Sequence, residues 1–255
     1  MGFDLEAVRI TALPEDAFYI SDFITEDEED WLLQKVKSAP LPRWTQLSHR
    51  RLQTWPSALT KNNALLASPL PTWLRSPIVE PRFEALRIFD DAPHQAPNHV
   101  LVNEYQPGQG IMPHEDGAAY YPLVATVSLG APIVLNVYHK HAQGDREESD
   151  ITAKARRDVV GIPDTNRRPQ YRILQERRSL LVTRCKMYTD LLHGIEETTR
   201  DEDLGPHSIC NWELLREREP YQSGWYERKT RTSLTYRDVL HVMKMGNTLK
   251  FLGGR

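Results

Sequence analysis

Cysteine is scarce in this chain of 255 residues, because Cys185 and Cys210 are the only two. Two cysteines cannot build a disulfide framework, and their scarcity favours a reducing compartment. No apolar run approaches the roughly 20 residues that a membrane span needs. The acidic N-terminus also lacks the basic and apolar pattern of a secretory signal. We therefore expect a soluble protein inside the cell, with no membrane partner.

An excess of positive charge is missing as well. Lys and Arg together number 32 against 35 Asp and Glu, which gives a formal charge of −3. Such a chain has no overall basic field to attract nucleic acid, so any such contact must rest on a local patch. One local excess lies in 153–178, where eight basic residues stand against three acidic ones. The excess supports two interpretations, a solvated loop or an electrostatic arm for nucleic acid.

Short segments with β-branched residues or alternating polarity dominate the chain after residue 98. They predict strands where Gly, Pro or charged residues bound them. Before them, Thr25 and Glu28 form a capping-box pattern that predicts a helix ending near Ser38. Strands that follow helical leaders predict a mainly β protein with flanking helices and a double-stranded β-helix (jelly roll) core. The predicted strands are 99–105, 121–130, 133–139, 171–176, 179–184 and 231–237.

We predict that residues 1–255 form a single domain. Two further helices are expected, a short one around 73–89 and an amphipathic one at the C-terminal end. The polar segment between two of the strands is longer than an ordinary loop of a compact domain, so we expect it to be flexible. The predicted parts are a helical leader (1–98, with a hairpin-like segment at 42–56), a jelly-roll core (99–138 and 171–255) and a charged insertion (139–170).

His114 and Asp116 stand two residues apart in the stretch IMPHEDG, which follows a predicted strand. In an extended strand, residues i and i+2 point to the same face, so this pair presents an imidazole nitrogen beside a carboxylate oxygen. A second histidine would complete the metal-binding triad of non-haem Fe(II) oxygenases. His193 is the best candidate, because it follows a predicted strand and precedes a glycine. The other histidines after Asp116 fall in expected loops or in the terminal helix: His139, His141, His207 and His241.

The segment RTSLTYR places two arginines at alternating positions of the last predicted strand. A guanidinium fork can bind both oxygens of a carboxylate. An inward-facing pair of arginines is costly unless an anion neutralises it. The pattern therefore predicts an anion site, although an outward-facing polar strand explains RTSLTYR taken alone equally well. An isolated H-x-D pair is likewise common at protein surfaces. The residues on the common face are Arg231, Ser233, Thr235 and Arg237.

Four ordered motifs together resemble the AlkB family of Fe(II)/2-oxoglutarate dioxygenases, and most closely its homologue six subgroup. They are Asn103-x-Tyr105-x-Pro-Gly, the H-x-D pair, a later histidine and R-x-S-x-T-Y-R. The resemblance covers most of the chain outside 139–170. It implies a site that uses Fe(II), 2-oxoglutarate and dioxygen, with no further catalytic acid or base. The implied roles are iron ligation by His114, Asp116 and His193, and cosubstrate binding by Asn103, Tyr105, Arg231, Ser233 and Arg237, with Arg231 at the distal carboxylate.

The resemblance also implies a reaction and a place for the substrate. Family members oxidatively remove alkyl groups, such as methyl, from nucleic-acid bases, and they carry a nucleotide-recognition lid where 42–56 falls here. Aromatic and basic residues there can stack on and clasp a single-stranded or flipped base. Ordinary packing is the competing interpretation. The candidates for substrate binding are Trp44, Arg50, Arg51, Trp55 and Tyr188.

Three other functions stay open on the sequence. One is a catalytically silent jelly-roll module that binds RNA or protein. Another is a demethylase or hydroxylase of a protein substrate. The third is a metal-dependent cupin without a keto-acid, which would not need the arginine pair. We further expect a monomer located in the cytoplasm and nucleus.

Overall fold

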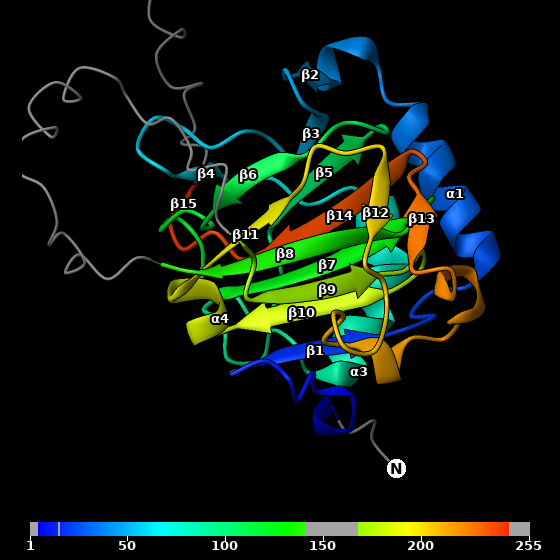
Figure 1. Cartoon of the computed structure of the whole chain (residues 1–255). Coiled ribbons are helices and arrows are strands. Elements are labelled where there is room, and N and C mark those ends of the chain that lie inside the picture. Colours follow the sequence, from blue (N-terminus) through cyan, green and yellow to red (C-terminus); the bar gives the residue numbers. More distant parts are fainter. Residues whose placement is uncertain (1–4, 15, 141–167, 245–255) are drawn as a thin grey trace, which may run out of the picture.

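The computed structural model describes residues 5–14, 16–140 and 168–244, and its main feature is two antiparallel sheets that face each other (Figure 1). The larger sheet has the order β1-β10-β7-β14-β5-β3-β2 and the smaller has the order β6-β11-β8-β9. All six predicted strands are present, and the mainly β jelly-roll fold is confirmed. The bounds are β1 Ala17–Ile20, β2 Thr45–Gln46, β3 Arg51–Trp55, β5 His99–Tyr105, β6 Ile111–His114, β7 Leu123–Leu129, β8 Ile133–His139, β9 Tyr171–Gln175, β10 Leu180–Arg184, β11 Leu191–Ile195 and β14 Arg231–Arg237.

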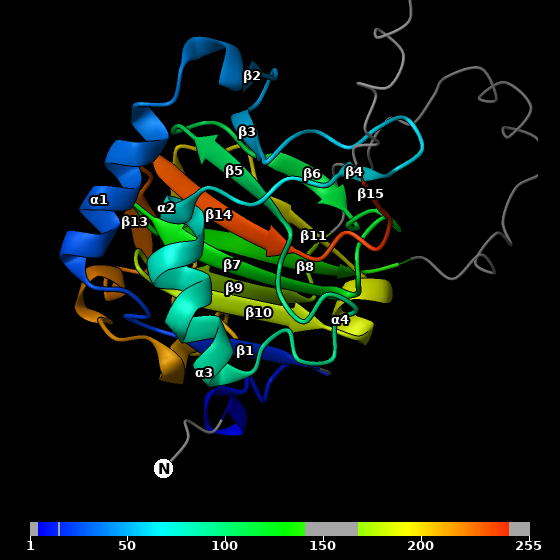
Figure 2. The same cartoon turned by 180° about the vertical axis from the view of Figure 1, so that it is seen from behind.

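Helix α1 (Glu26–Lys37) begins at the predicted capping box. The Thr25 hydroxyl accepts the Glu28 N–H at 3.2 Å, and the Glu28 carboxylate accepts the Thr25 N–H at 2.8 Å. Leu32 and Val36 are buried in the apolar cluster between α1 and the larger sheet. Figure 2 shows α1, α2 (Thr72–Leu74) and α3 (Glu84–Leu86) lying across the outer face of that sheet. The helices therefore cover one face and leave the other face to the smaller sheet.

The predicted hairpin in 42–56 is confirmed. A short turn over Leu41–Arg43 leads into β2, which pairs with β3 in antiparallel register. Strand β3 then pairs with β5, so the hairpin forms an edge of the larger sheet. Residues of this hairpin consequently alternate between the helix-covered face and the face that meets the smaller sheet.

The helix expected around 73–89 is interrupted. Ser76 and Glu80 have extended backbone conformations, with ψ of 130° and 115°, in the segment Arg75–Phe83 between α2 and α3. Each precedes a proline, and the proline ring disfavours the helical region for the residue before it. Helical periodicity alone therefore predicted a longer continuous helix than the structure contains.

The expected C-terminal helix is wrong over the described residues. After β14, Val239 bridges to Tyr120, and β15 (Val242–Met243) pairs in parallel with β4 (Leu65–Leu66). Backbone pairing with a distant segment thus overrides the amphipathic pattern of this stretch. His241 accordingly lies just before a short strand instead of in a helix, and 245–255 lie outside the described residues.

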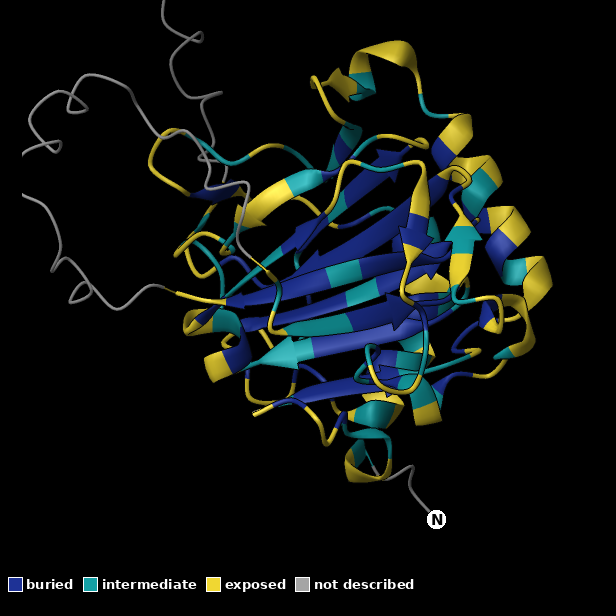
Figure 3. Cartoon of the chain, viewed as in Figure 1, coloured by how far each residue is buried: buried dark blue, intermediate teal, exposed yellow. Residues whose placement is uncertain are grey.

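Residues 200–227 form irregular structure beside the smaller sheet (Figure 1). They contain the pair β12 (Arg200–Glu202) and β13 (Trp225–Glu227) and two short turns. Figure 3 shows that burial concentrates in the strands of both sheets, whereas exposed residues gather on loops and the outer side of α1. The predicted flexible insertion falls mainly on 141–167, which lie outside the described residues, as does His141. Within the described part of the chain, no helix is long and apolar enough to cross a membrane.

Candidate metal and cosubstrate site

His114 and His193 lie directly opposite each other on neighbouring strands. His114 ends β6, His193 is in β11, and the two are register partners with ring centroids 4.4 Å apart. The strands approach closely here because Gly194 has no side chain. A Cβ at that position would lie 2.9 Å from the Ile111 carbonyl oxygen, which is closer than real Cβ atoms come. Strand pairing thus brings together two imidazoles that are 79 residues apart in the sequence.

Asp116 lies beside the two histidines, but not on the same strand as His114, where it was predicted. Strand β6 ends at His114, so the expected same-strand, i and i+2 geometry is wrong. Asp116 lies in the loop that follows, where it forms an ion pair with Arg237 of β14 through Oδ1. Its Oδ2 lies 4.0 Å from His193 Nε2. The carboxylate is therefore held in place from the larger sheet, while the histidines belong to the smaller one.

These three side chains can hold a divalent metal. One ligand atom from each lies within 4.8 Å of the others, and no second group of this kind occurs among the described residues. The His114 Nδ1 is 2.9 Å from the Met112 carbonyl oxygen, so Nδ1–H donates there and Nε2 keeps a free lone pair. Burial lowers the pKa of His193 to about 4, which keeps its ring neutral. Two imidazole nitrogens and a carboxylate oxygen are a ligand set that fits Fe(II).

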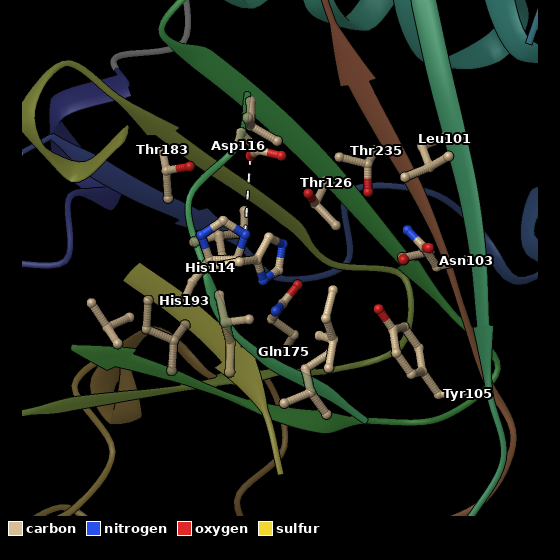
Figure 4. Close-up of a pocket in the computed structure, with 18 of the residues that line it drawn as sticks. Leu101, Asn103, Tyr105, His114, Asp116, Thr126, Gln175, Thr183, His193 and Thr235 are labelled. Atoms are coloured by element: carbon tan, nitrogen blue, oxygen red, sulfur yellow. Dashed lines mark ion pairs between the residues drawn. The ribbon is translucent and has the colours of Figure 1, made fainter. Parts of the chain in front are cut away.

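A pocket runs from the three candidate ligands into the space between the sheets. All four alternating residues of β14 line it, as the strand pattern predicted, together with Asn103 and Tyr105 of β5. Figure 4 shows Asn103 and Tyr105 extending from one strand toward the histidines. The candidate metal ligands and the candidate cosubstrate residues therefore share one cavity. Those on β14 are Arg231, Ser233, Thr235 and Arg237.

Arg231 is a buried cation without an acidic partner. It is 2% exposed, and its recorded hydrogen bonds are donated by Nη2 to Ser128 Oγ at 2.9 Å and to Gln175 Oε1 at 3.1 Å. Its Nε has no hydrogen-bond partner, and none of the described carboxylates forms an ion pair with it. Burial lowers the pKa of Arg231 to about 10. The buried Asn103 Oδ1 also lacks a partner. A carboxylate entering the pocket would supply the missing counterion, as the distal end of 2-oxoglutarate can.

The five candidate substrate residues are not brought together. Arg50 lines the pocket. In contrast, Arg51 and Trp55 pair in register with Glu104 and Val100, which alternate with the pocket-lining residues of β5. Their side chains lie on the helix-covered face, where Trp55 meets Trp73 edge-on with centroids 5.6 Å apart.

Trp44 and Tyr188 are also engaged elsewhere. Arg51 stacks over Trp44 at 4.1 Å and donates to Glu104 at 2.7 Å, so both side chains are tied to the sheet edge. Tyr188, in α4 (Lys186–Thr189), donates its hydroxyl hydrogen to the Gly117 carbonyl oxygen at 2.9 Å, next to the loop that carries Asp116. Of the five, only Arg50 is positioned to meet a ligand in the pocket.

Two polar residues that hold Arg231 escaped prediction from the sequence, and one of them, Gln175, also lines the pocket. Ser128 of β7 and Gln175 of β9 both accept from Arg231, and both are buried. The only available signal was a polar residue at the end of an otherwise apolar strand. That signal does not identify a partner on another strand.

Comparisons with known proteins agree with this geometry. The family model of the 2OG-Fe(II) oxygenase superfamily matches residues 16–237. A Danio rerio protein named "Probable RNA/DNA demethylase ALKBH6" is 38% identical over 251 residues, covering 98% of this chain and 95% of that protein. A Xenopus tropicalis protein named "tRNA (carboxymethyluridine(34)-5-O)-methyltransferase alkbh8" is 26% identical and covers 93% of this chain, but only 34% of that protein is matched.

Solved structures show the same fold. The structure of OsALKBH1 matches with a TM-score of 0.50 at 14% identity, covering 89% of this chain and 99% of that chain. A Burkholderia pseudomallei oxidoreductase of the 2OG-Fe(II) oxygenase family matches with the same TM-score at 13% identity, covering 89% and 88%. At these identities the likeness concerns the fold alone.

Proposed function

The chain belongs to the AlkB family within the 2OG-Fe(II) oxygenase superfamily, and from this premise we propose that it oxidatively removes alkyl groups from nucleic-acid bases. It is an Fe(II)- and 2-oxoglutarate-dependent dioxygenase. The observation that carries the proposal is the shared cavity, in which His114, Asp116 and His193 lie beside a buried guanidinium that lacks a counterion. A substrate of the nucleic-acid class is supported by the 38% identity to a protein named as an RNA/DNA demethylase.

Each part of the site has a separate task in this proposal. His114, Asp116 and His193 would hold the iron, which together with 2-oxoglutarate and dioxygen supplies the oxidising power for hydroxylating an N-alkyl carbon. Arg231 binds the distal carboxylate of the cosubstrate and thereby fixes how deeply it enters the pocket. Arg237 holds Oδ1 of Asp116, so that Oδ2 is directed toward His193. No side chain is needed to carry a proton.

The hairpin of β2 and β3 is the proposed approach for the substrate. Arg50 stands at its turn and lines the pocket, whereas the exposed Leu47 precedes it. The turn also reaches the β11–β12 connection, because His49 Nδ1 lies 3.1 Å from a Glu197 carboxylate oxygen. A base entering beside Arg50 would reach the cavity that the metal ligands also line. Trp55 takes no part, because its ring packs under the helices.

Formaldehyde and succinate release test the proposal. Purified Fe(II)-loaded protein is incubated with 2-oxoglutarate and with methylated single-stranded DNA, methylated single-stranded RNA, or methylated peptides. We expect both products in equal amounts from a methylated oligonucleotide, and none from its unmethylated counterpart. His193→Ala should abolish both products, whereas His207→Ala, outside the site, should leave them unchanged. Turnover of peptides alone would refute the nucleic-acid substrate, and the absence of any iron-dependent 2-oxoglutarate turnover would refute the enzyme. The monomeric state and the location in cytoplasm and nucleus stay predictions.

A further inference from the structure

Gln175 is the last residue of β9, and its side chain forms a hydrogen bond with Arg231. The side chain is 2% exposed, and it lines the same cavity as the candidate metal ligands. Figure 4 shows its amide directed into the pocket that holds His114 and His193. Gln175 therefore occupies a place where a bound keto-diacid would come within reach of its side chain.

The hydrogen bonds among Arg231, Gln175 and Ser128 determine which end of the Gln175 amide can face a ligand. Arg231 can only donate, so the Gln175 atom that meets its Nη2 must be the oxygen. The same Oε1 also accepts from the Ser128 hydroxyl at 3.2 Å. Both hydrogen bonds are accepted by Oε1, so the NH2 group of Gln175 takes part in neither. Among the described residues, none accepts a hydrogen bond from Gln175 Nε2.

The Gln175 amide thus differs from that of a glutamine whose two ends are both paired within the protein. Gln53 provides the contrast within this chain, because it is also fully buried but donates its Nε2 to the Val36 carbonyl oxygen at 2.9 Å. Gln175 Nε2 is not among the fully buried atoms that lack a partner, so it opens onto the cavity, where an incoming ligand can accept its hydrogen bond. The Gln175 donor is therefore available to an acceptor that enters the pocket with a ligand.

We propose that Gln175 is a second binding residue for the distal carboxylate of 2-oxoglutarate: Arg231 supplies the charge, and Gln175 supplies a neutral hydrogen bond and holds Arg231 in position. Ser128 completes the arrangement by accepting from Arg231 and donating to Gln175. The inference rests on the proposed cosubstrate site and adds a residue that the four sequence motifs do not contain. A neutral donor suits this place, because a second cation would leave the empty pocket with still more unpaired charge.

A comparison of two ligands isolates the contact. 2-Oxoglutarate and 2-oxopentanoate have the same chain length and the same keto-acid end, but only the first has a distal carboxylate. Their binding to Mn(II)-loaded protein is measured by calorimetry for the wild type and for Gln175→Leu. We expect the variant to bind 2-oxoglutarate about ten- to a hundredfold more weakly, as for the loss of a hydrogen bond to a charged group, while its affinity for 2-oxopentanoate stays within about twofold, because that ligand never made the contact.

Three further variants control the result. Gln53→Leu removes an equally buried glutamine on the helix-covered face and should change neither affinity. Ser128→Ala removes one acceptor of Arg231 but keeps the Gln175 donor, so it should weaken 2-oxoglutarate binding less than Gln175→Leu does. Gln175→Glu places a carboxylate beside Arg231. It should therefore abolish 2-oxoglutarate binding without lowering the unfolding temperature of the unliganded protein.

The outcomes separate this inference from the proposed function. If wild-type protein binds 2-oxoglutarate well and Gln175→Leu binds it equally well, Gln175 makes no contact and the inference fails alone. Equal weakening of both ligands would show a structural role and would also refute it. If the wild type does not prefer 2-oxoglutarate over 2-oxopentanoate, the cosubstrate site itself is wrong and both proposals fall together.

Discussion

Replacing Arg231 with methionine is expected to abolish 2-oxoglutarate binding while leaving the unliganded protein at least as stable as the wild type. Arg231 is a cation in the sheet interior with two neutral acceptors and no carboxylate. Folding must therefore remove its charge from water without an ion pair in return. Methionine has a similar length, is flexible enough to fill the space, and carries no charge.

The two effects have different magnitudes and opposite signs. Burial lowers the pKa of Arg231 from 12.5 to about 10, which corresponds to a penalty on the order of 3 kcal/mol for keeping it charged. Replacing Arg231 with methionine removes this penalty, which stabilises the fold. It also removes the hydrogen bonds to Ser128 and Gln175, which offsets part of that gain. A bound carboxylate that loses its buried partner loses roughly 3–5 kcal/mol. That loss is about a hundred- to several-thousand-fold in affinity.

Arg228 provides a matched control three residues earlier in the chain. It is as buried as Arg231, but it forms a two-point ion pair with the buried Asp201 at 2.7 and 2.9 Å. Arg228→Met should therefore destabilise the fold by roughly 3–5 kcal/mol, because it strands a buried carboxylate. Two buried arginines of one segment are thus expected to respond in opposite directions.

Thermal unfolding of Mn(II)-loaded protein, with and without 2-oxoglutarate, measures both effects. At a hundred times its dissociation constant, the ligand should stabilise the wild type by about 2.7 kcal/mol. It should leave Arg231→Met unchanged, whereas Arg228→Met should unfold at a lower temperature in both conditions. Two results would refute the reasoning: an Arg231→Met protein that still responds to 2-oxoglutarate, or one that loses as much stability as Arg228→Met.

Two further predictions concern the surroundings of the metal ligands. Arg237→Lys keeps the charge but loses the Nη2 group that contacts Asp116 Oδ1, so we expect roughly ten- to a hundredfold weaker Mn(II) binding in a metal titration, as for other residues that orient metal ligands. Unchanged metal affinity would contradict the positioning role. His99 is 2% exposed, and burial together with the nearby Arg237 lowers its pKa to about 4. Its unfolded form binds a proton below about 6.5 whereas the folded form does not until about 4, so stability is lost as the pH falls through this window, by up to roughly 3 kcal/mol. Urea unfolding of His99→Phe between pH 7 and 4 should show a shallower loss than the wild type, and parallel curves would refute the assignment.

The fold could be predicted where local signals and long-range packing agree. Six strands were recognisable because one or both of their faces are apolar in a two-residue period. The start of α1 was recognisable because Thr25 and Glu28 satisfy backbone groups within four residues of each other. In contrast, the helices expected around 73–89 and at the C-terminus depended on periodicity alone. The first is interrupted before Pro77 and Pro81, and the second gives way to pairing with Leu65 and Leu66.

The sequence by itself determined the chemistry of this protein, because metal and carboxylate ligands must be particular residue types and those types occur in an ordered set of motifs. Only the tertiary structure decided how they meet. His114 and His193 become neighbours through strand pairing, and Asp116 is oriented by its ion pair with Arg237. Gln175 comes next to Arg231 through a hydrogen bond between two distant strands. The structure also places the side chain of Trp55, a predicted substrate-binding residue, away from the pocket, because the alternation of β3 turns it toward the helices. Residue identity is local information, whereas the face a side chain occupies depends on the register of strands far apart in the chain.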